Sequence, residues 1–453
     1  MTARQLLATV PCLATLLLAG CANAQPAERE AKEQVSQIGS QLLSVGAKSE
    51  LPQLRPDSSL ADFGRYAVLN HPAVTASYQE WRGAVEAIAP SRALPDPKLT
   101  FEADIADTLM TFMPGLMFDF MTPGKRAAMA KEATASSQIA YRAYVSTVLK
   151  VASEVRKGWI DLGYIDAIIR LREASRAVIG QAAAVAETDY ATGRGMGTLE
   201  NQVRFANDAA RVRSEITALN DRLAAVRASF KSALGLLPTD ADPAWPHPAL
   251  VATALPPEDE LWRRIESSNS DLAQMRAMVD MALANVGVAR TAGTPDFALG
   301  VMADLKADPL MIRPTASVSL PIWRGKIASL IAAAEARWDA AISRLNAEQL
   351  TMAAQLAQML FMVRESDRMI AYIDGSALPN YERAMASEAA GYQSGMTGLA
   401  MIPETMLMSL GMQLERATAL KDRETAVTGL LLMISDTAPA GSPLLAESHA
   451  AQP

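Results

Sequence analysis

Apolar residues recur with a helical period over most of the chain. In the middle of the first half they step by three and four residues, at Val145, Val148, Ala152, Val155, Trp159 and Leu162. This spacing is typical of the seam of a coiled-coil-like helix. No proline occurs in residues 124–237, and a helix over about 126–190 would be roughly 100 Å long at ~1.5 Å per residue. The pattern predicts a mainly helical chain with helices longer than one globular core needs.

A two-residue alternation replaces the helical period at four places and predicts short strands there. We expect these strands at about 98–106, 116–122, 297–306 and 316–322. Phe101, Ile105, Leu299 and Leu305 fall on apolar faces, and the opposite faces carry Thr100, Glu102, Asp104, Met302 and Asp304. Such strands fit either a small water-soluble sheet covered by a helix or a transmembrane sheet, for which a strand needs about 9–11 residues. Four strands cannot close a barrel in lipid, so several chains would have to share one barrel.

The chain contains an internal repeat of about 200 residues. "PDPKLTFEAD" at Pro95 is followed by "PDFALGVMAD" at Pro295, and the Gly124-Lys125 pair returns as Gly325-Lys326. The repeat predicts two halves, 59–237 and 257–436, each with a helix, two strands, a long helix and a final helix. A proline-rich segment, 238–256, separates the halves, and residues 437–453 are expected to be a disordered tail.

The N-terminus reads as an export signal. Arg4 precedes the apolar run 6–18, which ends in "LLAGC". Small residues before Cys21 resemble the lipobox of bacterial lipoproteins, which predicts a signal peptide over 1–20, lipidation of Cys21 and an anchor or linker over 21–58. An ordinary secretory signal cleaved after Ala24 is the alternative. Because Cys12 and Cys21 are the two cysteines of the chain, the mature protein is expected to hold no disulfide.

Composition excludes several classes of function. The net charge is −7 and no basic stripe occurs, so nucleic acid is not an expected partner. No later apolar stretch reaches the ~18 residues of a transmembrane helix, which leaves a lipid anchor or a β-barrel as routes to a membrane. The chain has no nucleophile elbow, P-loop, dinucleotide fingerprint or HExxH motif, and its three histidines are scattered, so we expect neither an enzyme nor a bound metal or cofactor.

The motifs together resemble the TolC-like outer-membrane efflux family. The resemblance rests on the lipobox, the duplication, the strand pairs, "MTPGKRAAMAKEA" at 121–133, "SVSLPIWRGKIASLIAAAEA" at 317–336 and the Tyr-x-x-Gly turns. It implies a homotrimer in the outer membrane of a Gram-negative bacterium, with a shared 12-stranded β-barrel and a long α-helical barrel in the periplasm. It also implies an exit duct of a tripartite pump, whose partners are a periplasmic adaptor and an inner-membrane transporter.

The resemblance also implies roles for particular residues. The turns after the long helices would form the periplasmic tip that contacts the adaptor, at Tyr190, Gly193, Arg194, Gly195, Tyr392, Gly395, Met396 and Thr397. Family members often carry gate acids six and nine residues after the second glycine, which gives Met401 and Glu404 here, while Glu200 lies beside the matching position of the first half. Glu102, Asp104 and Asp304 would face the lumen. An alternative interpretation of equal weight is that Glu404 is simply an exposed residue on the first turn of a helix.

Two further questions stay open in the sequence. The 23 methionines supply soft thioether ligands, which makes export of metal ions such as copper or silver one candidate function, although methionine is also a common packing residue. The main alternative to a channel is a periplasmic coiled-coil lipoprotein, a scaffold or adaptor whose short strands never enter a membrane.

Overall fold

The computed structural model describes residues 26–43, 51, 53–106, 109–192, 198–305, 310–394 and 401–435. Most of them are helical, and the four strands among them form one antiparallel sheet in the order β1-β2-β3-β4. The chain divides into two compact units. The first unit holds 1–44, 76–144 and 271–349, and the second holds 45–75, 145–270 and 350–453. Both units therefore combine segments from the two halves of the sequence.

The first unit contains a buried cluster of aromatic side chains. It contains α2 (Pro26–Leu43), most of α4 (Pro72–Glu86), α5 (Ile88–Arg92) and α9 (Ser270–Arg290), with the first parts of α6 (Pro123–Thr192) and α10 (Arg324–Tyr372). Trp81 is 1% exposed and stacks on Tyr144 at 5.6 Å between ring centroids. Burial among these rings raises the pKa of Tyr144 to about 12. Tyr78 donates a hydrogen bond to the Val35 carbonyl at 3.0 Å, which holds α2 against α4.

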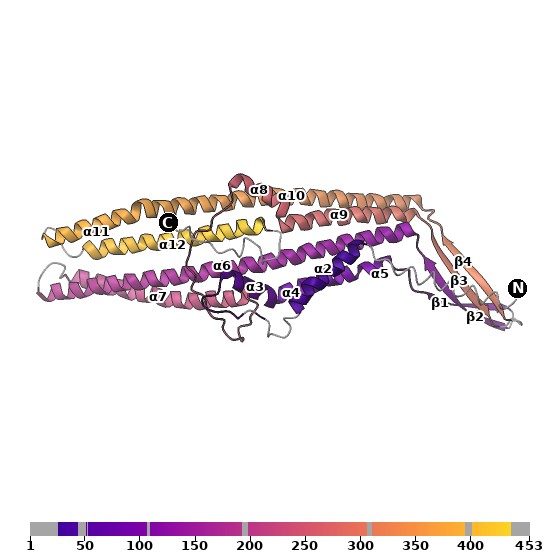
Figure 1. Ribbon diagram of the computed structural model, residues 1–453, viewed down its shortest axis with the longest axis horizontal. Coiled ribbons are helices and arrows are strands. Elements are labelled where there is room, and N and C mark those ends of the chain that lie inside the picture. Colours follow the sequence, from indigo (N-terminus) through magenta and orange to yellow (C-terminus); the bar gives the residue numbers. More distant parts are fainter. Residues whose placement is uncertain are drawn as a thin grey trace. The chain divides into compact units, whose positions relative to one another are not determined.

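The four strands lie in the first unit, next to the helices that precede and follow them in the chain (Figure 1). Their bounds are β1 (Lys98–Ala106), β2 (Leu109–Phe120), β3 (Asp296–Asp304) and β4 (Met311–Ser319). The alternation located β1 and β3 closely, but the expected bounds of β2 at 116–122 and β4 at 316–322 were wrong. Both strands begin earlier, because Pro114 and Pro314 do not end them. Each proline instead occupies a ladder position, opposite Phe101 and Val301 respectively.

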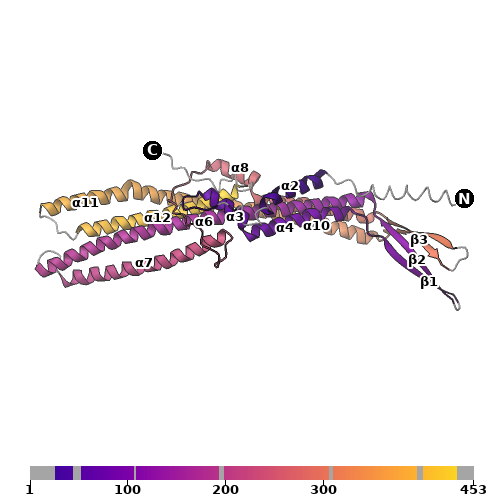
Figure 2. The ribbon, with the colours of Figure 1, turned by 60° about the horizontal axis from the view of Figure 1, so that its bottom comes forward.

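The second unit is built from helix pairs. It contains α3 (Leu60–Asn70), α7 (Leu199–Ala233), α8 (Glu258–Ser268), α11 (Leu378–Gln393) and α12 (Met401–Met433), with the later parts of α6 and α10. Figure 2 shows α7 beside α6 and α12 beside α11. The seam predicted on α6 is buried at Val148, Ala152, Val155 and Leu162, and Trp159 is partly buried. Further along, Ala182 and Ala186 of α6 pack on Phe205 of α7.

Local sequence explains where several helices of the second unit begin and end. Ser59 and Asp62 form a capping box at the start of α3, and the Thr198 side chain caps α7 by accepting from the Asn201 N–H at 3.2 Å. Gly235 ends α7 with a φ of +74°, a left-handed conformation that glycine adopts without strain. A side chain there would also meet the backbone of His71, since a Cβ at position 235 would lie 2.7 Å from its Cα.

The long helix of the second half is interrupted, whereas α6 continues for 70 residues. Residues Ile373–Ala377 form a π-helical turn between α10 and α11, in which the Leu378 N–H bonds the Ile373 carbonyl. Pro379 follows one residue later, and a proline ring clashes with the carbonyl four residues before it, here that of Gly375. The wider π-helical turn is the expected relief of that clash.

Candidate functional site

The register of the sheet separates its side chains into two faces of different chemistry. On one face Leu99 pairs with Leu116, Leu116 with Val301, and Phe297 with Val318. We call this the apolar face. The other face carries charged, hydroxyl and thioether side chains, and we call it the polar face: Lys98, Thr100, Glu102, Met113, Met117, Asp119, Asp296, Met302, Asp304, Arg313, Thr315, Ser317 and Ser319.

The apolar face is open in a single chain. Leu99, Leu299 and Ile312 are 65%, 55% and 66% exposed, on the first, third and fourth strands. No helix of the described part of the chain covers these residues, although a water-soluble sheet would bury such a face against one. Large contiguous apolar patches mark contacts with a partner or a membrane. The structure therefore disfavours a sheet whose apolar face is packed on a helix of the same chain.

Charges on the polar face are paired across strands. Lys98 Nζ lies 2.6 Å from Asp119 Oδ2, and Arg313 bonds Asp304 Oδ2 at 2.8 Å. Asp304 is only 9% exposed, because it belongs to this ion pair, and its expected place on a lumen wall stays a prediction. Glu102 is exposed and lies opposite Met113. The side chains of Asp104 and Ile105 lie outside the described part of the chain.

The two outer strands of the sheet each have one strand partner among the described residues. β1 pairs with β2, and β4 pairs with β3. An outer strand presents a row of backbone N–H and C=O groups that no neighbouring strand satisfies. In hydrocarbon each such group would cost several kcal/mol. A sheet with one apolar face and two such edges is incomplete as a membrane structure until other strands pair with it.

Several of the expected tip residues fall outside the part of the chain that is described. These are Gly193, Arg194, Gly195, Gly395, Met396 and Thr397, and the lipidation candidate Cys21 lies outside it as well. Tyr190 belongs to the last turns of α6 and is 52% exposed. Tyr392 lies in α11 and Met401 begins α12, but their side chains are not described. Glu200 stands exposed in the first turn of α7.

Glu404 is the gate candidate with a defined partner. It lies in the first turn of α12 and forms an ion pair with Arg204 of α7, so the pair joins the two halves of the sequence. The hydrogen bond that the Arg204 guanidinium donates to Glu404 raises the pKa of Arg204. Both partners are exposed, at 48% and 43%, so the pair contributes no more than about 1 kcal/mol to stability. Its position at the start of α12, near the chain reversal, makes it a contact that could be broken at low cost.

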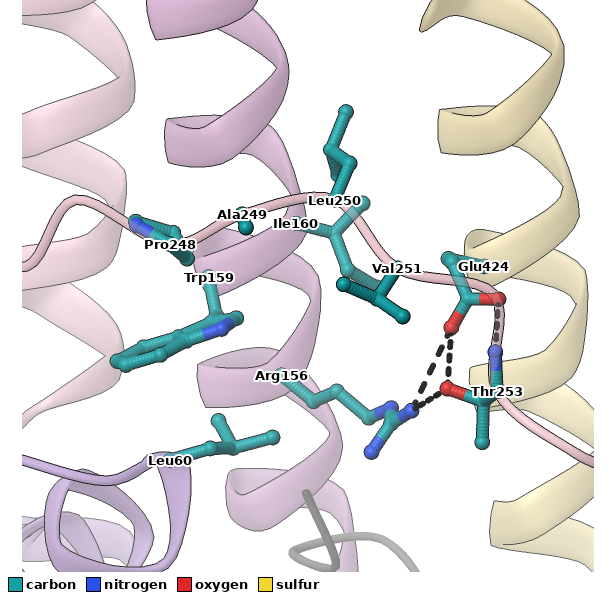
Figure 3. Close-up of a pocket in the computed structure, with 10 residues that line it drawn as sticks. All are labelled: Leu60, Arg156, Trp159, Ile160, Pro248, Ala249, Leu250, Val251, Thr253 and Glu424. Atoms are coloured by element: carbon teal, nitrogen blue, oxygen red, sulfur yellow. Dashed lines mark hydrogen bonds and ion pairs between the residues drawn. The ribbon is translucent and has the colours of Figure 1, made fainter. Parts of the chain in front are cut away.

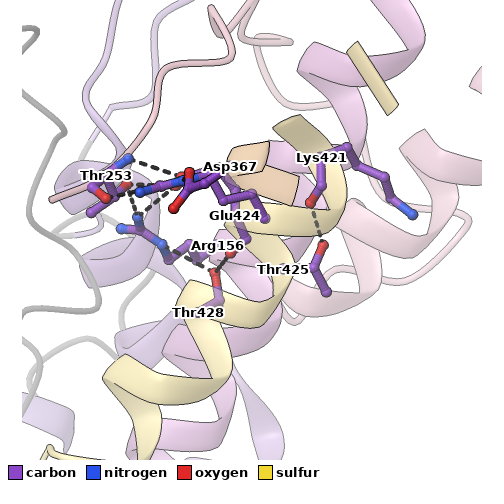
Figure 4. A network of polar contacts seen from close by, with 8 residues as sticks. Arg156, Thr253, Asp367, Lys421, Glu424, Thr425 and Thr428 are labelled. Carbon is purple, nitrogen blue, oxygen red and sulfur yellow. Dashed lines mark hydrogen bonds and ion pairs between the residues drawn. The ribbon is translucent and has the colours of Figure 1, made fainter. Parts of the chain in front are cut away.

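A buried polar network, absent from our sequence predictions, links three helices of the second unit to the inter-repeat segment (Figure 4). Arg156 of α6 is 4% exposed, lies 3.6 Å from Glu424 of α12 and donates to Thr253 Oγ1 at 2.8 Å. Glu424 accepts from the Thr253 backbone at 2.9 Å, and Arg423 bonds Asp367 of α10 at 2.6 Å. Burial lowers the pKa of Arg156, and the neighbouring Glu424 opposes that shift. In the sequence, Arg156 stands next to the seam residue Val155 but also between the charged residues Glu154 and Lys157, so no local pattern singled it out.

This network forms one wall of a small cavity of about 170 Å³ (Figure 3). Leu60, Trp159, Ile160 and the inter-repeat residues 248–251 supply the remaining wall. The charged groups of the wall already bond one another, and the rest is apolar. We therefore interpret the cavity as a gap in the packing between the inter-repeat segment and α6, not as a ligand site.

Two general features bear on what the site can do. Among the described residues, no group of three or more His, Cys, Asp or Glu side chains could hold a metal ion. Nor does any helix in the described ranges combine enough length and apolar character to cross a membrane.

Comparison with known proteins gives a family match for the second half of the chain. Residues 261–435 match the sequence profile described as outer membrane efflux protein. No curated protein sequence matches significantly.

Among solved structures, CusC, whose structures concern transmembrane channel formation, superposes with a TM-score of 0.70 at 15% identity, covering 85% of this chain and 94% of CusC. VceC, an outer membrane protein of Vibrio cholerae, gives 0.68 at 17% identity, covering 83% and 96%. The open MtrE outer membrane channel of Neisseria gonorrhoeae gives 0.64 at 15% identity, covering 85% and 91%. At these identities the superpositions establish the fold, and the profile match supplies the sequence relationship. The second half of the chain thus matches the outer membrane efflux protein family, and the described chain has the fold of outer membrane efflux channels.

Proposed function

We propose that the chain is one of three identical subunits of an outer-membrane exit duct in a tripartite efflux pump. Four strands from each of three copies would make a 12-stranded barrel, and the long helices of the copies would surround one periplasmic passage. Cargo would move passively through water from the periplasm to the outside. The chain needs no catalytic group for this, because the energy would come from an inner-membrane transporter joined through a periplasmic adaptor.

The observation that carries the proposal is the open apolar face on a sheet whose two outer edges have no strand partner among the described residues. Pairing β4 of one copy with β1 of the next satisfies both edges and closes the sheet. Closure places the apolar face toward lipid and the polar face toward a water-filled lumen, the arrangement of transmembrane barrels. β1, β3 and β4 have 9 residues and β2 has 12, which meets the length needed to cross hydrocarbon.

The remaining parts of the proposal concern anchoring and the tip. A lipid on Cys21 would tether each copy to the outer membrane beside its barrel. The reversals after α6 and α11 would meet the adaptor, with the Arg204–Glu404 pair holding α7 and α12 together in the closed tip. Breaking that contact between the two halves would be part of opening.

The methionine side chains on the polar face favour soft metal ions such as copper or silver as the cargo. Met302 lies opposite Gly115 on the polar face, and Met113 and Met117 flank that glycine two residues to either side. A Cβ at Gly115 would fall 2.4 Å from Cγ of Met302, so the methionine side chain covers the glycine. Thioethers on a lumen wall would offer weak, exchangeable contacts to Cu(I) or Ag(I).

The barrel is tested by placing the same charge on each face of the sheet. Leu299→Arg puts a guanidinium on the apolar face, which costs about 2–4 kcal/mol at the middle of a bilayer. Ser317→Arg puts it on the polar face, one strand away. We expect Leu299→Arg to abolish heat-modifiable trimers and ion conductance in planar bilayers. Ser317→Arg should assemble normally and change only conductance and ion selectivity.

The unaltered protein separates the duct from the scaffold alternative. A monomer without conductance, released from membranes once its lipid anchor is removed, would establish the coiled-coil scaffold and refute the duct. Equal assembly of the two arginine variants would also contradict the assignment of lipid and lumen faces.

A further inference from the structure

The junction between β4 and α10 carries an exposed aromatic side chain next to two exposed cations. Trp323 is 71% exposed, and Arg324 and Lys326 follow it in the first turn of α10. Neither cation has an ion pair or side-chain hydrogen bond within the described residues. Leu320 and Ile322 are 68% and 65% exposed and continue the apolar side chains of β4 toward the helix. The junction thus joins apolar, aromatic and cationic groups in that order along the chain.

The backbone of this junction is fixed by local hydrogen bonds. The Ile322 N–H bonds the Leu320 carbonyl at 2.9 Å, and the Arg324 N–H bonds the Ile322 carbonyl at 2.9 Å. These are successive three-residue turns, and Pro321 restrains the first of them. The Ile327 N–H then bonds the Trp323 carbonyl at 3.2 Å and begins the helix. Trp323 is therefore presented by an ordered backbone rather than by a long loop.

The matching junction of the first half is built differently. At the offset of 201 residues, Thr122 replaces Trp323 and Lys125 corresponds to Lys326. Lys125 is engaged by Asp296 at 2.6 Å, and Arg126 donates to the Arg92 carbonyl at 3.0 Å. The first-half cations thus serve contacts within the chain. The second-half cations Arg324 and Lys326 have no such contact among the described residues, so they are available for a ligand.

Chemistry and position identify that ligand. Phe120 pairs with Phe297 at the end of the sheet nearest the helices, and Trp323 follows β4 at the same end. Tryptophan is enriched at the boundary between acyl chains and headgroups, and lysine and arginine just beyond it attract anionic headgroups. The order of the groups, apolar to aromatic to cationic, matches the order of acyl chain, glycerol and phosphate in a phospholipid.

We propose that Trp323, Arg324 and Lys326 form a phospholipid anchor, in which the two cations bind the phosphate of an anionic lipid in the leaflet facing the helices. This inference rests on the proposed barrel, which places the junction at that leaflet. Each trimer would carry three such anchors and would prefer anionic over zwitterionic lipids. The anchor would also set the depth of the sheet in the bilayer.

The depth of Trp323 is tested by fluorescence quenching with the full-length protein in vesicles. Bromine on lipid chains near the headgroup should quench more of the emission of the wild type than of Trp323→Phe, and bromine near the chain ends should not. Equal quenching of the two proteins by both lipids, in samples that conduct ions, would overturn the anchor and leave the duct intact. Absence of both quenching and conductance would refute the duct and the anchor together.

The role of the cations is tested by lipid selection. The Arg324→Gln/Lys326→Gln variant should lower the preference for phosphatidylglycerol over phosphatidylcholine by about 25-fold, the product of a factor of about five for each cation. The matched control is Arg337→Gln/Arg344→Gln, which removes two exposed cations of the same helix, at least ~20 Å further from the junction at ~1.5 Å per residue. The control should retain the preference. Loss of the preference in both variants, or in neither, would contradict a site at the junction, and trimer bands verify assembly in each case.

Discussion

Two glycines of α6, Gly163 and Gly180, differ in whether a side chain at their position would meet a neighbouring segment. Gly163 faces the inter-repeat segment, and a Cβ there would lie 2.7 Å from the carbonyl oxygen of Pro248. Gly180 lies on the same helix with open space where its Cβ would be. A glycine at position 163 thus permits the contact with the segment that joins the halves, whereas no contact among the described residues explains Gly180.

We expect Gly163→Ala and Gly180→Ala to have opposite effects on stability. Gly163→Ala forces residue 248 away from α6 and should lower the free energy of unfolding by about 1–3 kcal/mol. Gly180→Ala should raise it by up to about 1 kcal/mol, because alanine has the higher helix propensity. Thermal unfolding of the two purified variants measures both changes. Stabilisation by Gly163→Ala would show that the segment does not rest on this face of α6.

The Arg204–Glu404 pair allows the two interpretations of Glu404 to be separated. If the pair holds the tip closed, Arg204→Gln and Glu404→Gln should each raise single-channel conductance, and the double variant should add little, because either change breaks the same contact. If Glu404 instead forms an acidic ring in the lumen, Glu404→Gln alone should reduce cation selectivity. Stability should change by less than about 1 kcal/mol in every variant, since the pair is exposed.

At the scale of elements, the two long helices differ despite their common origin in a repeat. α6 is continuous, whereas α10 and α11 are separated by the π-helical turn Ile373–Ala377. The guanidinium of Arg416 in α12 donates two hydrogen bonds to the carboxylate of Asp374 inside that turn, at 2.6 and 3.0 Å. These bonds tie the turn to the neighbouring helix α12. A π-helical turn with such a side contact is a place where the end of the helix pair can bend relative to the part before it.

Replacing the proline behind this turn should straighten the helix. Pro379→Ala removes the ring that clashes with the Gly375 carbonyl, so we expect an α-helical turn and a gain of up to about 3 kcal/mol. Pro403→Ala is the matched control, because Pro403 lies in the first turn of α12, where proline is tolerated. Melting temperature reports the gain, and reduced channel opening in bilayers would report the loss of the bend. Equal melting temperatures for the two variants would contradict strain at residue 379.

At the scale of the whole molecule, one chain leaves α10 largely uncovered. In the second unit, only one line of side chains along α10 and the turn after it is buried, and the other positions are partly or fully exposed. The exposed positions Leu350, Phe361 and Tyr372 recur every 11 residues and are 74%, 55% and 57% exposed. A spacing of 11 residues keeps side chains on one face of a nearly straight helix. A long helix with such a face is expected to pack against another copy.

The assembly predicts the effect of changing this face. If a second copy covers Phe361, Phe361→Ala should destabilise the trimer by about 1.5–3 kcal/mol per copy, the value for burying a phenylalanine side chain. If the residue stays in water, the change should be within about 0.5 kcal/mol. Heat-modifiable trimer bands over a temperature series measure the difference. Phe361→Leu, which keeps an apolar side chain, should retain most of the trimer.

The sequence determined the fold class, the repeat and the two faces of the sheet. Helical and two-residue periods are local properties, because burial repeats with the geometry of each element. For that reason the α6 seam and strands β1 and β3 could be located from residue patterns. The ends of β2 and β4 could not, because a proline, which lacks an N–H, is accepted in a ladder only where no neighbouring strand needs that donor. Pro114 lies just outside the β2–β3 ladder, and Pro314 lies in the outer strand β4.

The tertiary structure alone decided which charges are free and which are engaged. Asp304 with Arg313, Glu404 with Arg204, and Arg156 with Glu424 are separated by 9 to 268 residues, so no local pattern relates the more distant partners. The same holds for Lys125 and Lys326, which occupy equivalent positions in the repeat. The first is bonded to Asp296 and the second is left open beside Trp323. Local chemistry fixes what a side chain can bind, and the packing of distant segments fixes what it meets.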